Sequence, residues 1–300
     1  MRPMRTAGVT TVSLLLTLAA CDATETPVPT PASVASGARS AGPVSAIEFY
    51  PASFVDATAV DNRWFPLIPG TQMTWEGHAL DGSDRLERKV VFTVTDLVKE
   101  IDGVSSVVIW ERDYTDGELQ EVELSFFAQD VGGSVWHLGE DPEEYENGEI
   151  VKHPTWIAGF QGSLPGIHMP ANSSLDDPSY SQGWGPKVGW NDRGDTYAVG
   201  QHTCTPVDCY DNVLVIREYS RSEPGAYQLK YYAPGIGNVR VSWGGPNEDE
   251  HEVLVLTGLV QLEGGALADV RAKALAQEAR AYEQSPGAYG ETAPSEVRSG

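Results

Sequence analysis

"VVFTVTDLVKEIDGVSSVVIWERDYTDGELQEVELSFFAQ", residues 90–129, determines which kind of sheet this chain forms. It holds three runs of β-branched and aromatic residues, separated by Asp102-Gly103 and Asp116-Gly117. Asp-Gly pairs permit the positive φ angles that tight β-hairpins require. A parallel sheet would need a crossover of a dozen or more residues between strands, and this stretch has no room for one. It therefore predicts an antiparallel meander.

Similar strand signals continue on the C-terminal side. Gly132-Gly133 leads into another apolar run, and a second meander begins after residue 200. The runs are "SVWHL" (134–138), "NVLVIREYS" (212–220), "YQLKYYA" (227–233), "NVRVSW" (238–243) and "HEVLVLTGLVQL" (251–262). We therefore expect a mainly β domain over residues 47–263, an antiparallel meander of about ten strands that forms a half-barrel or a sandwich.

One motif occurs in both meanders. "FFAQDVGGSVW" (126–136) and "YYAPGIGNVR" (231–240) share two aromatic residues, an Ala, a short gap and a Gly. Each comes after an apolar strand, "VVIWER" in the first case and "VLVIRE" in the second. The repeat favours two related halves. The alternative, that unrelated meanders resemble each other, stays open.

The C-terminal part contains one convincing helix. Residues 264–283, "GGALADVRAKALAQEARAYE", are rich in Ala, and Asp269 and Lys273 form a favourable i, i+4 pair. The sequence predicts that this helix packs one side on the sheet. We expect residues 284–300 to be a disordered tail.

The N-terminal part has the features of an export signal. Residues 1–20 contain two cations and no acid, then the twelve apolar residues "VTTVSLLLTLAA", too few to span a bilayer as a helix. Leu18-Ala19-Ala20-Cys21 resembles the lipobox of bacterial lipoproteins. That resemblance implies cleavage before Cys21 and lipidation of its thiol with acyl chains such as palmitate. An ordinary secretory signal with a chance Cys is the alternative. Residues 21–46 lack large apolar side chains and are expected to form a flexible stalk.

The charge balance excludes several kinds of partner. Without residues 1–20 the chain carries 18 Lys and Arg against 43 Asp and Glu. Such a surface repels nucleic acid and anionic lipid headgroups, so we expect no nucleic-acid binding and membrane contact through the lipid anchor only. The favoured partners are neutral, cationic or apolar.

Two cysteines remain in the folded part. Cys204 and Cys209 lie in "HTCTPVDCYDN", and outside the cytoplasm such a pair predicts a disulfide. Metal binding by both thiolates with His202 is the alternative, but no fourth ligand is evident. The other histidines are scattered, so the sequence predicts no metal site and no cofactor.

The segment 154–200 is rich in Gly and Pro and reads as a long loop that carries large aromatic residues. Such loops are usually functional or disordered, and the aromatic residues argue against disorder. The candidate ligand-binding residues are Trp156, Trp184 and Trp190, which could stack on sugars or line a site for an acyl chain. Alternatively, they plug one end of the barrel or sandwich.

Four motifs resemble those of a family of uncharacterised bacterial envelope lipoproteins. They are "WFPLIPGTQMTWEG" (64–77), "FFAQDVGGSVWHLGED" (126–141), "AGFQGSLPGIHMPA" (158–171) and "YYAPGIGNVR" (231–240). The resemblance covers most of residues 54–260 and implies a place in the cell envelope. It implies no known activity and no catalytic residue. A looser likeness is to half-barrel folds that carry lipids or lipoproteins.

Two functional hypotheses are consistent with these features. The favoured one is a non-enzymatic protein, lipid-anchored on the extracytoplasmic face of the cytoplasmic membrane, that binds an apolar or sugar-containing ligand or an envelope partner. The alternative is an envelope glycan hydrolase that uses Glu140 and Asp141 beside Trp136. Hydrolysis would need two carboxyl groups on one face, about 5 Å or about 6.5–9.5 Å apart.

Overall fold

The computed structural model describes residues 48–298. The signal peptide (1–20), the lipidated Cys21 and the stalk (21–46) lie outside the described residues, so these three remain predictions. Within residues 48–298, no helix combines the length and the apolar character needed to cross a membrane.

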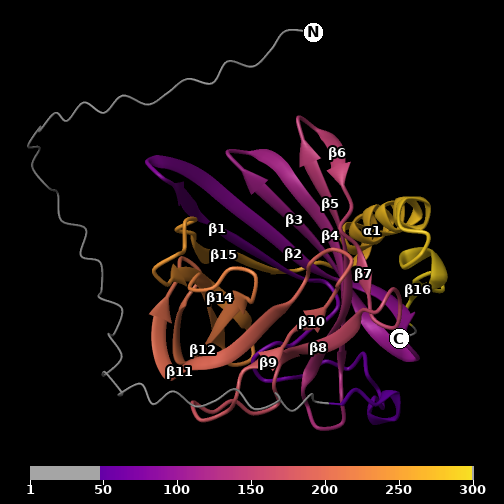
Figure 1. The fold of residues 1–300 in the computed structure, drawn as a ribbon, viewed down its shortest axis with the longest axis horizontal. Helices are drawn as coiled ribbons and strands as arrows, with labels where there is room; N and C mark the ends of the chain where they lie inside the picture. The colour runs from indigo at the N-terminus through magenta and orange to yellow at the C-terminus, as the bar shows by residue number, and fades with distance from the viewer. Residues whose placement is uncertain (1–47, 299–300) are drawn as a thin grey trace, which may run out of the picture. The chain divides into compact units, whose positions relative to one another are not determined.

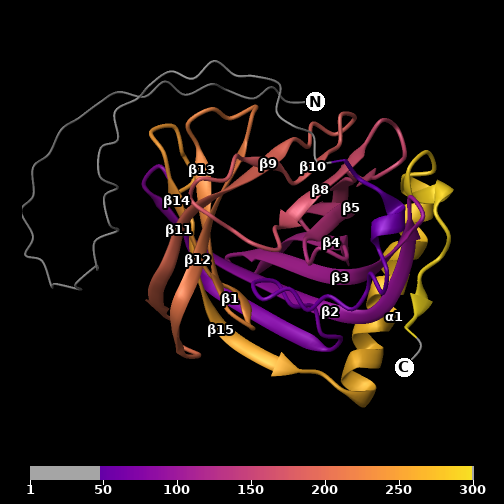
Figure 2. The ribbon, with the colours of Figure 1, turned by 90° about the horizontal axis from the view of Figure 1, so that it is seen from below.

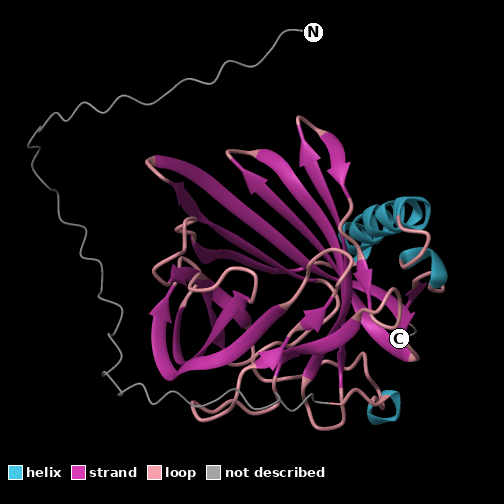
Figure 3. Ribbon diagram, viewed as in Figure 1, coloured by secondary structure: helices cyan, strands magenta, loops and turns pink. Residues whose placement is uncertain are grey.

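The described chain forms a sixteen-stranded sheet (Figures 1 and 3), and its neighbouring strands pair antiparallel. Ten strands are long: β1 (Thr71–Asp81), β2 (Asp84–Ile101), β3 (Val104–Thr115), β4 (Glu118–Gln129), β5 (Val135–Glu146), β11 (Asp192–Cys204), β12 (Cys209–Ser220), β13 (Tyr227–Ala233), β14 (Gly237–Gly244) and β15 (Val253–Gln261). Six are short: β6 (Glu149–Lys152), β7 (Trp156–Ile157), β8 (Leu164–Met169), β9 (Tyr180–Ser181), β10 (Gly183–Trp184) and β16 (Glu296–Val297). The predicted mainly β fold is confirmed, and the short strands account for the number above ten.

The sheet curves strongly, so that β1–β5 face β11–β14 across its concave side (Figure 2). The helix α1 (Gly264–Gln284) lies on the convex side against β2 and β4. Because successive side chains of a strand point to opposite faces, the chain builds two cores. Phe126 belongs to the core beneath the helix, whereas Phe127 belongs to the core on the concave side.

The repeated motif corresponds to the same structural feature in both meanders. In the β4–β5 hairpin the register shifts between Phe126 and Phe127, and in the β13–β14 hairpin it shifts between Tyr231 and Tyr232. Each shift is a β-bulge at the matching pair of aromatic residues. Bulges change the direction of a strand and are retained within families. The bulges therefore support the expectation of two related halves.

The disordered tail expected after residue 284 is contradicted for residues 285–298. The chain folds back after α1, buries Tyr289 and adds β16 to β2. The carboxylate of Glu278 accepts hydrogen bonds from the backbone N–H and the hydroxyl of Ser295, and Lys99 Nζ donates to Ala293 O at 2.7 Å. A buried polar network therefore orders a segment that has little apolar surface of its own.

The long loop predicted over residues 154–200 is also corrected, because it contains four short strands and the start of β11. The segment 180–184 joins the two ends of the sheet: its first half, β9, pairs with β11, and its second half, β10, pairs with β8. We call this segment the seam. A Cβ on Gly166 of β8 would lie 2.1 Å from the backbone N of Gly183, so the pairing requires glycine there.

Candidate functional site

A cavity of about 1260 Å³ lies on the concave side of the sheet. Its lining residues come from β1–β5 on one wall and from β11–β15 on the other. Two further segments, one around Phe65 and one around Trp190, complete the lining. The volume is above the usual range of about 300–1,000 Å³ for cavities that hold organic ligands. The curvature of the sheet thus positions a site that no single strand could form.

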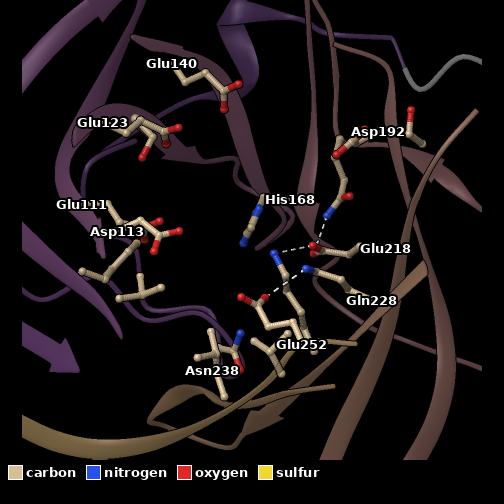
Figure 4. Close-up of a pocket in the computed structure, with 18 of the residues that line it drawn as sticks. Glu111, Asp113, Glu123, Glu140, His168, Asp192, Glu218, Gln228, Asn238 and Glu252 are labelled. Carbon is tan, nitrogen blue, oxygen red and sulfur yellow. Dashed lines mark hydrogen bonds and ion pairs between the residues drawn. The ribbon is translucent and has the colours of Figure 1, made fainter. Parts of the chain in front are cut away.

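The lining is strongly acidic. It includes thirteen carboxylates but only two side chains with a permanent positive charge, Arg88 and Lys230, so most of the negative charge has no partner of opposite sign. The acids are Glu111, Asp113, Glu121, Glu123, Glu140, Glu144, Asp192, Glu218, Glu223, Glu248, Asp249, Glu250 and Glu252. In Figure 4, Glu111, Glu123 and Glu140 lie on one wall and Asp192 and Glu218 on the facing wall.

The two cations pair with carboxylates on both walls of the cavity. Lys230 Nζ lies 2.6 Å from Glu218 Oε2, and Arg88 contacts Asp113 at 2.6 Å and Glu252 at 3.3 Å. Burial alone would raise the pKa of Glu218, but the Lys230 ammonium lowers it below its ordinary value. Glu218, Asp113 and Glu252 therefore each have a cationic partner.

Four carboxyl groups on β3, β4 and β5 form what we call the acid cluster: Glu111, Glu121, Glu123 and Glu140. None of them forms an ion pair with Lys or Arg in residues 48–298. The register places Glu111 directly opposite Glu123, and Asp113 opposite Glu121. Like charges in directly opposed positions repel each other. Within the described residues, the acid cluster thus lacks a cationic partner from the protein itself.

Burial raises the pKa of each member of the acid cluster. The pKa of Glu111 and of Glu121 rises to about 7, with Asp113 adding repulsion in both cases. Burial raises the pKa of Glu140 to about 8, which the nearby Trp156 partly offsets, and burial with the charge of Glu140 raises that of Glu123 well above its ordinary value. A substantial fraction of these carboxyl groups is therefore protonated near neutral pH.

A run of rings extends from the acid cluster along the cavity. His137 stacks on Phe127 at 4.8 Å, Phe127 lies 5.3 Å from Phe65, and Phe65 lies 6.2 Å from Phe92, all between ring centroids. Trp75 continues the run at 6.2 Å from Phe92. Burial lowers the pKa of His137 to about 3, so its imidazole is neutral. One region of the cavity is therefore anionic and the adjoining region is apolar.

The three predicted tryptophans occupy different positions. Trp190 lines the cavity, whereas Trp156 is 1% exposed and stacks on Trp190 with centroids 5.9 Å apart. Trp184 is 43% exposed and does not line the cavity. Residues 154–200 therefore form part of the wall of the barrel. Of the three tryptophans, only Trp190 can contact a ligand in this cavity.

Cys204 and Cys209 form a disulfide across the ends of β11 and β12, outside the cavity lining. His202 Nε2 lies 3.5 Å from the sulfur of Cys204. Since each sulfur is bonded to the other, neither offers a thiolate, and the described geometry does not favour the metal alternative.

The carboxylate pair proposed for glycan hydrolysis is separated by the sheet. Glu140 lines the cavity, whereas Asp141 points to the convex side, where it accepts a hydrogen bond from Thr155 at 2.6 Å. Trp136 packs in the core beneath the helix and donates to Asp130. Adjacent residues of a strand face opposite ways, so this pair cannot act on one bond.

Apart from Glu140, the acid cluster escaped the sequence prediction. Its signal is the alternation of acids in "WERDYTDGELQEVEL" (110–124), where Glu111 and Asp113 precede the turn and Glu121 and Glu123 come after it. Acids at alternate positions normally mark the solvated face of a strand. Only the curvature of the sheet converts that face into the wall of a cavity.

The empty protein is expected to lose stability between about pH 6.5 and pH 8.5. Carboxyls of the unfolded chain are ionised throughout this range, whereas Glu111, Glu121 and Glu140 still bind protons in the folded state. The folded state therefore binds more protons, and its stability falls as pH rises, by on the order of 2 kcal/mol over this range. His137 and His168 stay neutral in the folded protein at these pH values, because burial lowers their pKa to about 3 and about 4.

Urea midpoints at three pH values would measure this loss. The variant Glu111→Gln/Glu121→Gln/Glu140→Gln should have a flatter profile than the parent protein. A parent midpoint that rises with pH over the same range would contradict the assignment of protonated carboxyls.

Comparisons with known proteins assign no family to the chain. No protein-family model matches it, and no curated protein matches its sequence. A "putative exported protein with YmcC-like fold" from Bacteroides fragilis is 13% identical, with a TM-score of 0.40, over 67% of this chain and 100% of that chain. A "putative lipoprotein" from Parabacteroides distasonis is 16% identical, with a TM-score of 0.34, over 66% of this chain and 99% of that chain. At these values the likeness carries no functional conclusion, so the function has to be inferred from the geometry of the cavity itself.

Proposed function

We propose that this protein is a non-enzymatic binding protein of the cell envelope that holds an amphiphilic organic cation in its cavity. The observation that carries the proposal is the acid cluster, which lacks a Lys or Arg partner among the described residues and adjoins a run of aromatic rings. Glu140 is buried and the other three acids are half-buried, and ionising carboxyl groups in such positions is costly unless they are paired, so a cationic ligand would supply the missing partner. Its apolar part would lie along Phe127, Phe65 and Phe92.

An organic cation fits the cavity better than a bare metal ion does. Among residues 48–298, the only His, Cys, Asp or Glu side chains that bring three donor atoms within 4.8 Å of one another are His202, Cys204 and Cys209. The acid cluster therefore does not present the converging oxygens that Ca²⁺ or Mg²⁺ requires. Carboxylates spread along a wall suit a ligand with several N–H donors or an extended body.

The place of the protein in the envelope is part of the same proposal. The lipobox-like Leu18-Ala19-Ala20-Cys21 supports export and a lipid anchor at Cys21, on the extracytoplasmic face of the cytoplasmic membrane. The acidic composition supports contact with the membrane through the anchor alone, because anionic headgroups repel the folded part.

Isothermal titration calorimetry with three probes of equal chain length tests the proposal. The purified protein should bind octylamine, which is cationic at neutral pH, and should bind octanoate and octanol at least tenfold more weakly. Glu123→Gln/Glu140→Gln should weaken octylamine binding at least tenfold, since it removes two of the four uncompensated carboxylates.

The matched control is Glu100→Gln/Glu149→Gln, which removes the same formal charge from two exposed positions outside the cavity. It should bind octylamine as the parent protein does. Octanoate or octanol binding as tightly as octylamine, or no binding of octylamine, would contradict the proposal.

A further inference from the structure

We infer that the cationic head of the ligand is a primary ammonium group, held at a subsite formed by Glu140 of β5, Glu123 of β4 and His137 of β5. The inference rests on the proposed function and adds to it the chemistry of the head group. It distinguishes a primary amine from a quaternary ammonium ion, which carries the same charge but no N–H donor.

The first support is a buried ring nitrogen without a hydrogen-bond partner, beside a buried carboxyl group. His137 is 5% exposed and lines the cavity, and its Nε2 has no hydrogen-bond partner among residues 48–298. Glu140 Oε2 lies 3.7 Å from that nitrogen, too far for a hydrogen bond between them. Glu140 is also buried. Buried polar atoms are normally paired, so this pair of side chains indicates a missing group.

The second support is the charge around this point. Burial is the largest cause of the raised pKa of Glu140. Repulsion by three neighbouring acids, Glu121, Asp192 and Glu111, raises that pKa further. Carboxylates from β3, β4 and β11 thus surround the subsite. An ammonium group offers three N–H donors with its charge. In the imidazole tautomer that carries its proton on Nδ1, it could donate to Glu140 and to His137 Nε2 together, with the Glu123 carboxyl group nearby, which a single-donor group cannot do.

The third support concerns the nearby aromatic rings. Quaternary ammonium ions are typically held by several free ring faces. Trp156 lies outside the cavity lining and stacks on the lining residue Trp190 at an interplanar angle of 21°, and His137 stacks on Phe127 at 18°. Each stacked pair occupies one face of each of its rings, which leaves fewer ring faces free beside Glu140 and His137. The rings therefore serve the apolar body of the ligand rather than its head.

Binding of octylamine and of octyltrimethylammonium to the purified protein tests the inference. The two probes share chain length and charge, and they differ in the N–H donors. The parent protein should bind octylamine at least tenfold more tightly, because a site built from hydrogen-bond acceptors rejects an analogue without donors.

His137→Phe supplies the matched variant, since it keeps a ring against Phe127 and removes the acceptor. It should weaken octylamine binding about tenfold and leave octyltrimethylammonium binding unchanged. If this variant does not fold, Glu140→Gln, which keeps the shape of the side chain, should reduce the preference between the two probes.

The outcomes separate the two claims. Equal binding of both probes to the parent protein would overturn the ammonium subsite and leave the proposed cation binding intact. Binding of neither probe would overturn the proposed function itself. A His137→Phe variant that folds and keeps the full preference for octylamine would remove His137 from the subsite.

Discussion

Lys99→Met is expected to lower the free energy of unfolding by about 3–5 kcal/mol, because it leaves a buried carboxylate without its partner. Lys99 on β2 is 1% exposed, and its Nζ lies 2.8 Å from Glu278 Oε1 of α1. It also lies 4.3 Å from the ring centroid of Tyr289. Burial lowers the pKa of Lys99, and the Glu278 carboxylate opposes that shift.

Urea denaturation of the parent and variant proteins would measure this loss. The double variant Lys99→Met/Glu278→Gln should recover part of it, since the uncompensated charge is then gone. Residues 285–298 should become sensitive to limited proteolysis in Lys99→Met, because Glu278 and Lys99 hold that segment. An unchanged urea midpoint would contradict this description of the tail.

A matched control lies on the same strand. Lys89 of β2 pairs with Glu76 at 3.5 Å, but the two side chains are 48% and 49% exposed. Exposed ion pairs contribute little, so Lys89→Met should change the free energy of unfolding by less than about 1 kcal/mol. The difference between Lys99→Met and Lys89→Met would show that the stability loss comes from burial of the ion pair.

Gly166→Ala is expected to destabilise the protein by about 3 kcal/mol or more, because a methyl group has no space at the seam. The new Cβ would lie 2.1 Å from the backbone N of Gly183 and 2.2 Å from the backbone C of Gln182. These are backbone atoms, so β8 and β10 would have to separate. The wall that carries Trp190 would then be disturbed, and octylamine binding should weaken with the loss of stability.

Gly265→Ala is the control for this substitution. Gly265 lies in α1, and no atom would be within 4 Å of its new Cβ. Ala is the better helix former by up to about 1 kcal/mol, so the urea midpoint should stay the same or rise. A Gly166→Ala variant with the parent's midpoint would mean that the seam is not closed by this pairing.

The local features of the fold were predictable, and the reason is the chemistry of the turns. Asp102-Gly103 and Asp116-Gly117 have positive φ angles at both residues, as the hairpins require. The tail was mispredicted because its order depends on Lys99, which is 179 residues from Glu278 along the chain. The seam was likewise missed, since the close approach of Gly166 to Gly183 depends on how the whole sheet curves.

The acid cluster could be predicted only in part, because a bulge sets its register. The pairing of β3 with β4 shifts between Asp113 and Tyr114, and beyond that shift Glu111 lies opposite Glu123. A slip of one residue moves every side chain of a strand to the other face. A hairpin without the bulge would have placed Glu111 and Glu123 on opposite faces, so the sequence alone did not determine that these acids meet.

Crystals of the protein with 8-bromooctylamine would locate both ends of a probe ligand, since bromine is visible by its anomalous scattering. We predict the nitrogen within hydrogen-bond distance of Glu140 and His137, and the bromine farther along the ring series, beside Phe65. A bromine position outside the cavity, or a nitrogen directed away from the acid cluster, would contradict the proposal that this cavity binds organic cations.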